Sequence, residues 1–449
     1  MARRRRKALP KDPVTATITG LSHEGRGIAQ VDGKTVFIHN ALPGEEVSFK
    51  YTFSKSSHAE GEALEITNPS PDRVSPPCQH YGMCGGCSLQ HLAHPAQIDH
   101  KQKTLLEHLQ HFGNVVPQTI LPPLTGPTQN YRHKARLGVR YVGKKDKVLV
   151  GFRERNGRYL ADIDSCPILA KPMADLITPL SELIIGLSIK EQLPQIEVAM
   201  DDSETALIMR HLEPFSDEDL TAITAFAEQH HLQLYFQPGG PKTIHKHYPA
   251  DGNERLSLNL ASENVTLQFY PTDFTQVNTD INQQMVARAI ELLALSPEDR
   301  VLDLFCGLGN FSIPIAKRAK HVVGVEGETA MVERAQENAR LNKLNNTLFY
   351  AANLAEDCLS HPWMQLSYDK VLIDPPRSGA EVLIRQLPKL NPNRIVYVSC
   401  NPATLARDAG ILVNEQGYQL VSAGIMDMFP HTSHVESIAL FTRAHNGKD

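Results

Sequence analysis

The C-terminal third of the chain alternates strand-like and helix-like segments, and this pattern constrains the fold more than any other feature. Four short apolar runs predict buried strands, and two amphipathic segments predict helices. The predicted strands are Val301–Phe305, His321–Val325, Lys370–Ile373 and Arg394–Val398. The predicted helices are Ile281–Leu295 and Thr329–Leu344. Such alternation is typical of an α/β domain with a doubly wound sheet.

Reactive side chains stand where these strands end, the edge at which an open α/β sheet holds its active site. Cys400, in Ser-Cys-Asn-Pro, follows the last strand, and Asp374, in Asp-Pro-Pro-Arg, follows the third. A thiol in this place favours covalent attack on a substrate, although free cysteine is often only a small buried side chain. Asp374 could bind substrate or cofactor, or cap a helix. Glu436, before a final predicted strand, is a candidate general base or an ordinary surface carboxylate.

A second group of residues is typical of a cofactor loop. Gly307 and Gly309 follow Val301–Phe305 and allow the backbone to approach a ligand closely. Glu326 ends the next strand, where a carboxylate can accept the ribose hydroxyls of a nucleoside. Because the dinucleotide fingerprint is incomplete, we expect S-adenosylmethionine rather than NAD.

The cysteines indicate a metal site and not a disulfide scaffold. The chain has seven cysteines and no apparent export signal. Cys78, Cys84 and Cys87 crowd into one short segment, and Cys166 is the best candidate for a fourth ligand. Four thiolates suit zinc or an iron–sulfur cluster, and the spacing does not decide between them.

The N-terminal region predicts a small all-β domain of the OB type, a fold that often binds nucleic acid. Its predicted strands are Val14–Ile18, Gly27–Val31, Thr35–Ile38, Glu46–Tyr51 and Glu62–Ile66. The net charge of −5 alone argues against a nucleic-acid-binding protein, but the basic residues are clustered along the chain. Residues 3–7 form a basic arm, either a solubilising tail or a phosphate contact, and residues 132–158 are rich in Arg and Lys. The second stretch favours an RNA or DNA footprint.

Length and hydropathy indicate the number of domains and the cellular location. A chain of 449 residues has room for two or three domains. No apolar run reaches the length of a membrane span, and the N-terminus lacks the apolar core of a signal peptide. We therefore expect a cytoplasmic protein.

Taken together, these motifs resemble the RNA (uracil-5-)-methyltransferase family over nearly the whole chain. The matching segments are residues 20–27, typical of a TRAM domain, and 274–278, 303–311, 374–377, 399–402 and 434–436. The cysteines at 78, 84, 87 and 166 match the family's [4Fe–4S] ligands. The TRAM domain and the cluster set the chain apart from the tRNA-specific enzyme, which lacks both, so the resemblance is greatest to the members that act on 23S rRNA.

The resemblance implies a covalent mechanism. Cys400 attacks C6 of uracil, C5 then accepts a methyl group from S-adenosylmethionine, and Glu436 removes the C5 proton. The cofactor pocket would comprise Gln276, Phe305, Asn310, Glu326, Asn353 and Asp374. Gln276 and Asp374 also reach the uracil edge in this interpretation. Position 353 is Asn where many methyltransferases use Asp, but Asn can still pair with the adenine amino group.

The resemblance also implies domain boundaries and a target. The expected domains are a TRAM domain at 1–70, a central α+β domain with the iron–sulfur site at 71–95 and 129–270, and a Rossmann-like methyltransferase domain at 96–128 and 271–449. The expected substrate is a specific uridine of 23S rRNA, at position 1939, and the expected enzyme is a monomer.

Three alternatives remain open. A radical methylthiotransferase also combines a TRAM domain with a cluster, but it needs a Cys-x3-Cys-x2-Cys motif that is absent here and has no use for Cys400. A non-catalytic RNA-binding protein leaves Cys400 and Glu436 unexplained. The same chemistry on another 23S rRNA or tRNA uridine cannot be distinguished by these motifs.

Overall fold

The chain folds as two units in the computed structural model, which describes residues 9–10 and 12–443. Of these, residues 9–10, 12–101 and 429–434 form the first unit, and residues 102–428 and 435–443 form the second. The basic arm at 3–7 lies outside the described residues. Within the described part of the chain, no helix has the length and apolar character needed to cross a membrane.

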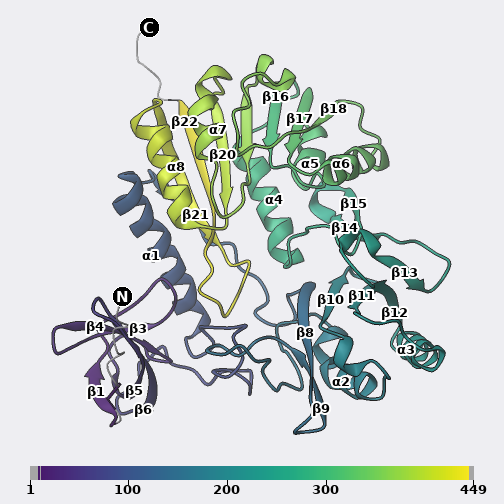
Figure 1. The fold of residues 1–449 in the computed structure, drawn as a ribbon. Coiled ribbons are helices and arrows are strands. Elements are labelled where there is room, and N and C mark those ends of the chain that lie inside the picture. The colour runs from purple at the N-terminus through teal and green to yellow at the C-terminus, as the bar shows by residue number, and fades with distance from the viewer. Residues whose placement is uncertain (1–8, 11, 444–449) are drawn as a thin grey trace, which may run out of the picture. The chain divides into compact units, whose positions relative to one another are not determined.

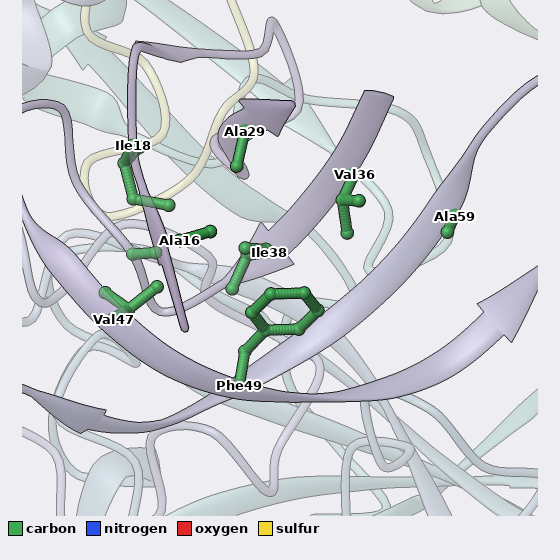
Figure 2. Close-up of a cluster of buried hydrophobic side chains, with 9 residues drawn as sticks. Ala16, Ile18, Ala29, Val36, Ile38, Val47, Phe49 and Ala59 are labelled. Carbon is green, nitrogen blue, oxygen red and sulfur yellow. The ribbon is translucent and has the colours of Figure 1, made fainter. Parts of the chain in front are cut away.

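The first unit contains a curved six-stranded sheet in the order β1-β5-β6-β4-β3-β2. Its strands are β1 (Val14–Thr17), β2 (Gly20–Leu21), β3 (Gly27–Val31), β4 (Lys34–His39), β5 (Glu46–Ser54) and β6 (Ala59–Ile66). Alternate apolar side chains, among them Ile38, Val47 and Phe49, point inward and form its core (Figure 2). Gly61 permits this packing, because a Cβ there would lie 2.5 Å from Phe49 Cδ2. All five sequence-predicted strands are confirmed, with β2 as an addition.

The same unit anchors the loop that precedes the final strand. The carbonyl of His431 accepts hydrogen bonds from the N–H groups of Ser88 and Leu89, both at 2.9 Å. The N–H of His431 donates to the side-chain oxygen of Gln97, also at 2.9 Å. Gln97 lies in helix α1 (His94–Gly113). The loop is therefore held at His431 by hydrogen bonds to residues 88–97, which lie more than three hundred residues earlier in the chain.

The second unit begins with a sheet in the order β13-β12-β11-β10-β8-β9. Its strands are β8 (Lys134–Val142), β9 (Lys147–Gly151), β10 (Gln195–Met200), β11 (Thr205–Arg210), β12 (Leu232–Gln237) and β13 (His245–Tyr248). Helix α2 (Ile177–Ile185) packs on β9, and α3 (Asp217–Gln229) packs on β12. The hairpin of β14 (Leu256–Leu260) and β15 (Val265–Phe269) follows.

The C-terminal part of this unit forms an eight-stranded sheet in the order β18-β17-β16-β19-β20-β22-β21-β7 (Figure 1). The strands are β7 (Thr119–Ile120), β16 (Arg300–Leu304), β17 (His321–Glu326), β18 (Thr347–Ala351), β19 (Lys370–Ile373), β20 (Arg394–Ser399), β21 (Tyr418–Met426) and β22 (Glu436–Arg443). The first five in sheet order are parallel, and β22 is antiparallel to β20. The strand order reverses between β16 and β19, so a ligand crevice is expected at their carboxyl ends.

Helices cover this sheet in two groups. Mutual contacts join α4 (Thr279–Leu293), α5 (Ser312–Ala316) and α6 (Thr329–Leu341), whereas α7 (Glu381–Gln386) packs on α8 (Pro402–Asn414). Right-handed crossovers on either side of the strand reversal put the two groups on opposite faces, which makes the sheet doubly wound as predicted.

Several predicted boundaries were wrong by a few residues. The strand predicted at Val301–Phe305 ends at Leu304, because Phe305 adopts a left-handed backbone with φ 63°. The helix predicted at Thr329–Leu344 ends at Leu341, where the side chain of Asn342 turns to the backbone of Thr266. Strands β18, β21 and β7 were not predicted.

Candidate active site

Cys400 occupies the turn between β20 and α8, held by the residue that follows it. The side chain of Asn401 caps α8 by accepting the N–H of Ala403 at 3.1 Å. Its amide nitrogen donates to the carbonyl of Arg377 at 3.0 Å, in the loop that begins with Asp374. Asn401 therefore ties the Cys400 turn to the Asp374 loop, and the two loops form one edge of the sheet.

The β20–β22 ladder brings Glu436 near Cys400. The ladder ends at the pair of Ser399 and Ser437; Cys400 directly follows Ser399, Glu436 directly precedes Ser437, and the charge of Glu436 acts on Cys400. Burial raises the pKa of Cys400 to about 11, and the negative charges of Glu436 and Asp374 act in the same direction while Arg377 opposes them. The resting group at neutral pH is therefore a thiol beside two carboxyl groups.

Three acidic side chains crowd the carboxyl ends of β16, β17 and β19. Burial raises the pKa of Asp303 to about 7 against the hydrogen bond from Ser312, and Asp374 and Glu326 add to the rise. Burial and the charge of Glu326 raise the pKa of Asp374 to about 7 as well. The crowding disfavours a further negative charge, and it creates a place where a cation would be stabilised.

The loop after β16 has the backbone freedom that a ligand site needs. Gly307 has φ 53°, and a Cβ added there would meet nothing within 4 Å. Its N–H donates to Glu326 at 3.1 Å, and the N–H of Gly327 donates to the same carboxylate at 2.7 Å. Gly309 has φ 95°, and a Cβ there would lie 2.9 Å from Ile313. The loop therefore leaves open space beside an oriented carboxylate.

The remaining predicted cofactor residues follow the same edge or the start of α4. Asn310 exchanges two hydrogen bonds with Asn282 of α4, at 3.0 and 2.9 Å. Asn353 is exposed beyond β18, where its amide nitrogen donates to Glu356 at 2.6 Å. Gln276 is half-buried and precedes α4. Sequence reasoning missed Asn282 as an orienting residue, since its partner lies 28 residues away and no local pattern marks it.

The four predicted metal ligands lie in different parts of the fold. Cys78, Cys84 and Cys87 belong to an irregular segment of the first unit, and Cys166 belongs to the second. None of these four cysteines forms a disulfide bond. Among residues 9–10 and 12–443, no three His, Cys, Asp or Glu side chains are grouped so as to hold a metal ion.

Comparison with known proteins identifies the family and the fold. The family model described as tRNA (Uracil-5-)-methyltransferase matches residues 93–444, and the model described as TRAM domain matches residues 12–64. The solved structure of Pyrococcus abyssi tRNA (uracil-54, C5)-methyltransferase, in complex with S-adenosyl-L-homocysteine, superposes with a TM-score of 0.73 at 24% identity. The match covers 96% of this chain and 100% of that one, so the two share their fold.

Two curated relatives are much more similar in sequence. The 23S rRNA (uracil(1939)-C(5))-methyltransferase RlmD of Francisella tularensis subsp. novicida is 55% identical over 95% of this chain and 96% of its own length. The enzyme of the same name from Hahella chejuensis is 53% identical over 98% of this chain and 100% of its own. The chain therefore belongs to the tRNA (uracil-5-)-methyltransferase family and carries an N-terminal TRAM domain.

Proposed function

We propose that this enzyme transfers a methyl group from S-adenosylmethionine to C5 of uridine 1939 of 23S rRNA, the reaction for which its curated relatives are named. The main support for the proposal is that the β20–β22 ladder ends with Cys400 and Glu436 close together at the carboxyl edge of the sheet. A nucleophile and a base on facing strand ends can act on the two adjacent carbons of one pyrimidine ring.

In this mechanism Cys400 is the nucleophile and Glu436 the general base. The Cys400 thiol loses its proton to solvent as its sulfur bonds to C6 of uracil, and the electrons of the C5–C6 double bond move onto C5 and the adjacent carbonyl, which makes C5 nucleophilic. S-adenosylmethionine, when bound, supplies the electrophilic methyl group that C5 receives. Glu436 then removes the C5 proton, and the electrons of that C–H bond restore the C5–C6 double bond as the bond from sulfur to C6 breaks. Gln276 and Asp374 are proposed to hold the uracil edge.

The proposed cofactor residues fit a cationic nucleoside in their chemistry. They are Gln276, Phe305, Asn310, Glu326, Asn353 and Asp374. Asp303, Asp374 and Glu326 together favour a positive charge, which a sulfonium ion carries, and the open space beside Gly307 leaves room for a close approach. Glu326 is already oriented by backbone N–H groups and has oxygen lone pairs left for ribose hydroxyls.

We further propose that Cys78, Cys84, Cys87 and Cys166 hold a [4Fe–4S] cluster, for which their thiolates are the usual ligands. The described residues contain no assembled metal group, so the support is the donor chemistry. The reaction above needs no electron transfer, and the cluster would have a structural or RNA-positioning role. Anaerobic analysis of the purified protein should find about four irons and four sulfides per chain. One zinc per chain would contradict the assignment.

The chain is further proposed to comprise three domains. They are 1–70 for TRAM, 71–95 with 129–270 for the central domain, and 96–128 with 271–449 for the methyltransferase domain. The pairing of β7 with β21 supports the last assignment, since residues 119–120 extend the methyltransferase sheet.

The decisive experiment is methylation of unmodified 23S rRNA in vitro, with the product base mapped by mass spectrometry. The expected product is 5-methyluridine at position 1939. Methylation of a different uridine, or of tRNA alone, would refute the target while retaining the chemistry. A requirement for a reductant, with release of 5′-deoxyadenosine, would favour the radical enzyme.

A further inference from the structure

A hollow of about 830 Å³ lies between the β8–β9 hairpin and residues 152–160. The chain at 152–161 folds back on itself, because the N–H of Glu154 donates to the carbonyl of Tyr159 at 2.9 Å. This turn rests on β8 through Leu160, whose Cδ2 would lie 2.6 Å from a Cβ at Gly138. Gly138 thus makes room for one wall of a concavity that is large enough for a nucleotide.

The hollow is strongly basic. Its lining contains no carboxylate and five cationic side chains, Arg136, Arg140, Lys144, Arg153 and Arg158. Arg136 and Arg140 alternate with the buried Leu137 and Val139 along β8, so both project from the exposed face of the strand.

Most of this positive charge is not neutralised within the protein. Arg136 pairs with Glu197 at 2.8 Å, and no ion pair within the described part of the chain involves the other four cations of the hollow. In a chain with net charge −5, four unneutralised cations around one concavity are a local excess. Such an excess matches the charge of a phosphodiester backbone.

One aromatic ring stands open beside these cations. Tyr159 is 75% exposed and directly follows Arg158. Tyr141, which also lines the hollow, is covered by Lys190 at 4.8 Å from its ring centre. An exposed aromatic ring next to cations is the arrangement on which unpaired bases stack, whereas the bases of a duplex are already stacked on each other.

We propose that this hollow binds an unpaired segment of the RNA substrate, outside the target uridine, with one base stacked on Tyr159 and adjacent phosphates on Arg140, Lys144, Arg153 and Arg158. The inference rests on the proposed function, because it takes the substrate to be RNA. The site would add affinity and fix the register of the RNA strand without taking part in the chemistry.

The test is RNA binding by the full chain without S-adenosylmethionine, measured by fluorescence anisotropy on a labelled 23S rRNA fragment that contains uridine 1939. Tyr159→Ala should weaken binding about tenfold, and Tyr159→Phe should keep the wild-type affinity, because the ring and not the hydroxyl stacks. Lys144→Gln should reduce the slope of log affinity against log salt by about 0.7, the effect of one lost contact to single-stranded phosphate. Lys389→Gln removes an exposed lysine elsewhere and should leave the slope unchanged.

Two results would overturn the proposal. If Tyr159→Ala binds the fragment with unchanged affinity, no base stacks on Tyr159. If Lys144→Gln and Lys389→Gln have equal salt slopes, Lys144 makes no phosphate contact. Failure of the proposed function looks different: the wild-type protein would bind the fragment with the predicted variant effects yet methylate no uridine in it. If the wild-type protein methylates normally and the variants bind RNA as the wild type does, the proposed function would be supported and this binding site would be refuted.

Discussion

The crowded carboxyl groups make cofactor affinity depend on pH in a calculable way. Burial and the charges of neighbouring carboxylates, Glu326 for both groups and Asp374 for Asp303, raise the pKa values of Asp303 and Asp374 to about 7, so both are partly protonated near neutrality. A bound sulfonium cation stabilises the charged carboxylates and lowers their pKa values, so binding releases protons. We therefore expect S-adenosylmethionine to bind more tightly as pH rises from about 6 to 8, with about half a proton released at pH 7 for each carboxyl group that the cofactor ionises.

The size of the effect follows from the pKa values. A carboxyl group with a pKa of about 7 that is fully ionised in the complex changes the affinity about tenfold between pH 6 and 8. The affinity therefore rises about tenfold if the cation ionises one of the two groups, and about a hundredfold if it ionises both. Asp303→Asn removes one titrating group and leaves an oxygen for the Ser312 hydroxyl, so the rise should become smaller.

Isothermal titration calorimetry at pH 6, 7 and 8, in buffers of different ionisation enthalpy, measures both the affinity and the proton release. S-adenosylhomocysteine is the matched control, because it lacks the methyl group and the sulfonium charge but keeps the rest of the molecule. Its affinity should rise less over the same range. An S-adenosylmethionine affinity that changes less than twofold between pH 6 and 8, or two ligands with the same pH curve, would refute this account.

Three further predictions concern single side chains. Cys400→Ala should abolish methylation but keep S-adenosylmethionine affinity within about twofold by calorimetry, since the thiol is proposed to contact the uracil and not the cofactor. Substantial residual turnover would contradict the covalent mechanism. Glu436→Gln should stall after methyl transfer and accumulate a methylated RNA–protein adduct on denaturing gels, and fast turnover without an adduct would exclude Glu436 as the base. Arg73→Met leaves Glu45 buried without its partner at 2.8 Å and should lower stability by about 3 kcal/mol in denaturant unfolding, whereas a change below about 1 kcal/mol would mean the ion pair contributes little.

The core strands of the methyltransferase sheet could be predicted because each is a continuous apolar run buried on both faces. The strand β18 could not, since it lies at the sheet edge and its residues are only partly buried. The start of α4 was missed by two residues because its cap is the side chain of Asn278, which accepts the N–H of Ile281 at 3.2 Å. Local patterns thus predict elements that are uniformly buried. They fail for strands at a sheet edge and for helix ends that are fixed by a capping side chain.

The proximity of Cys400 and Glu436 could not be predicted from sequence patterns. Strands β20 and β22 are buried almost throughout, so neither has the alternation of polar and apolar residues that would fix their register. A slip of one residue would turn Glu436 to the opposite face of the sheet. The register is instead set by tertiary contacts, such as the hydrogen bond from the Ser437 hydroxyl to the carbonyl of Ser399 at 3.3 Å. The positions of the proposed nucleophile and the proposed base therefore depend on one ladder, and any change that shifts β22 should separate them even with both side chains intact.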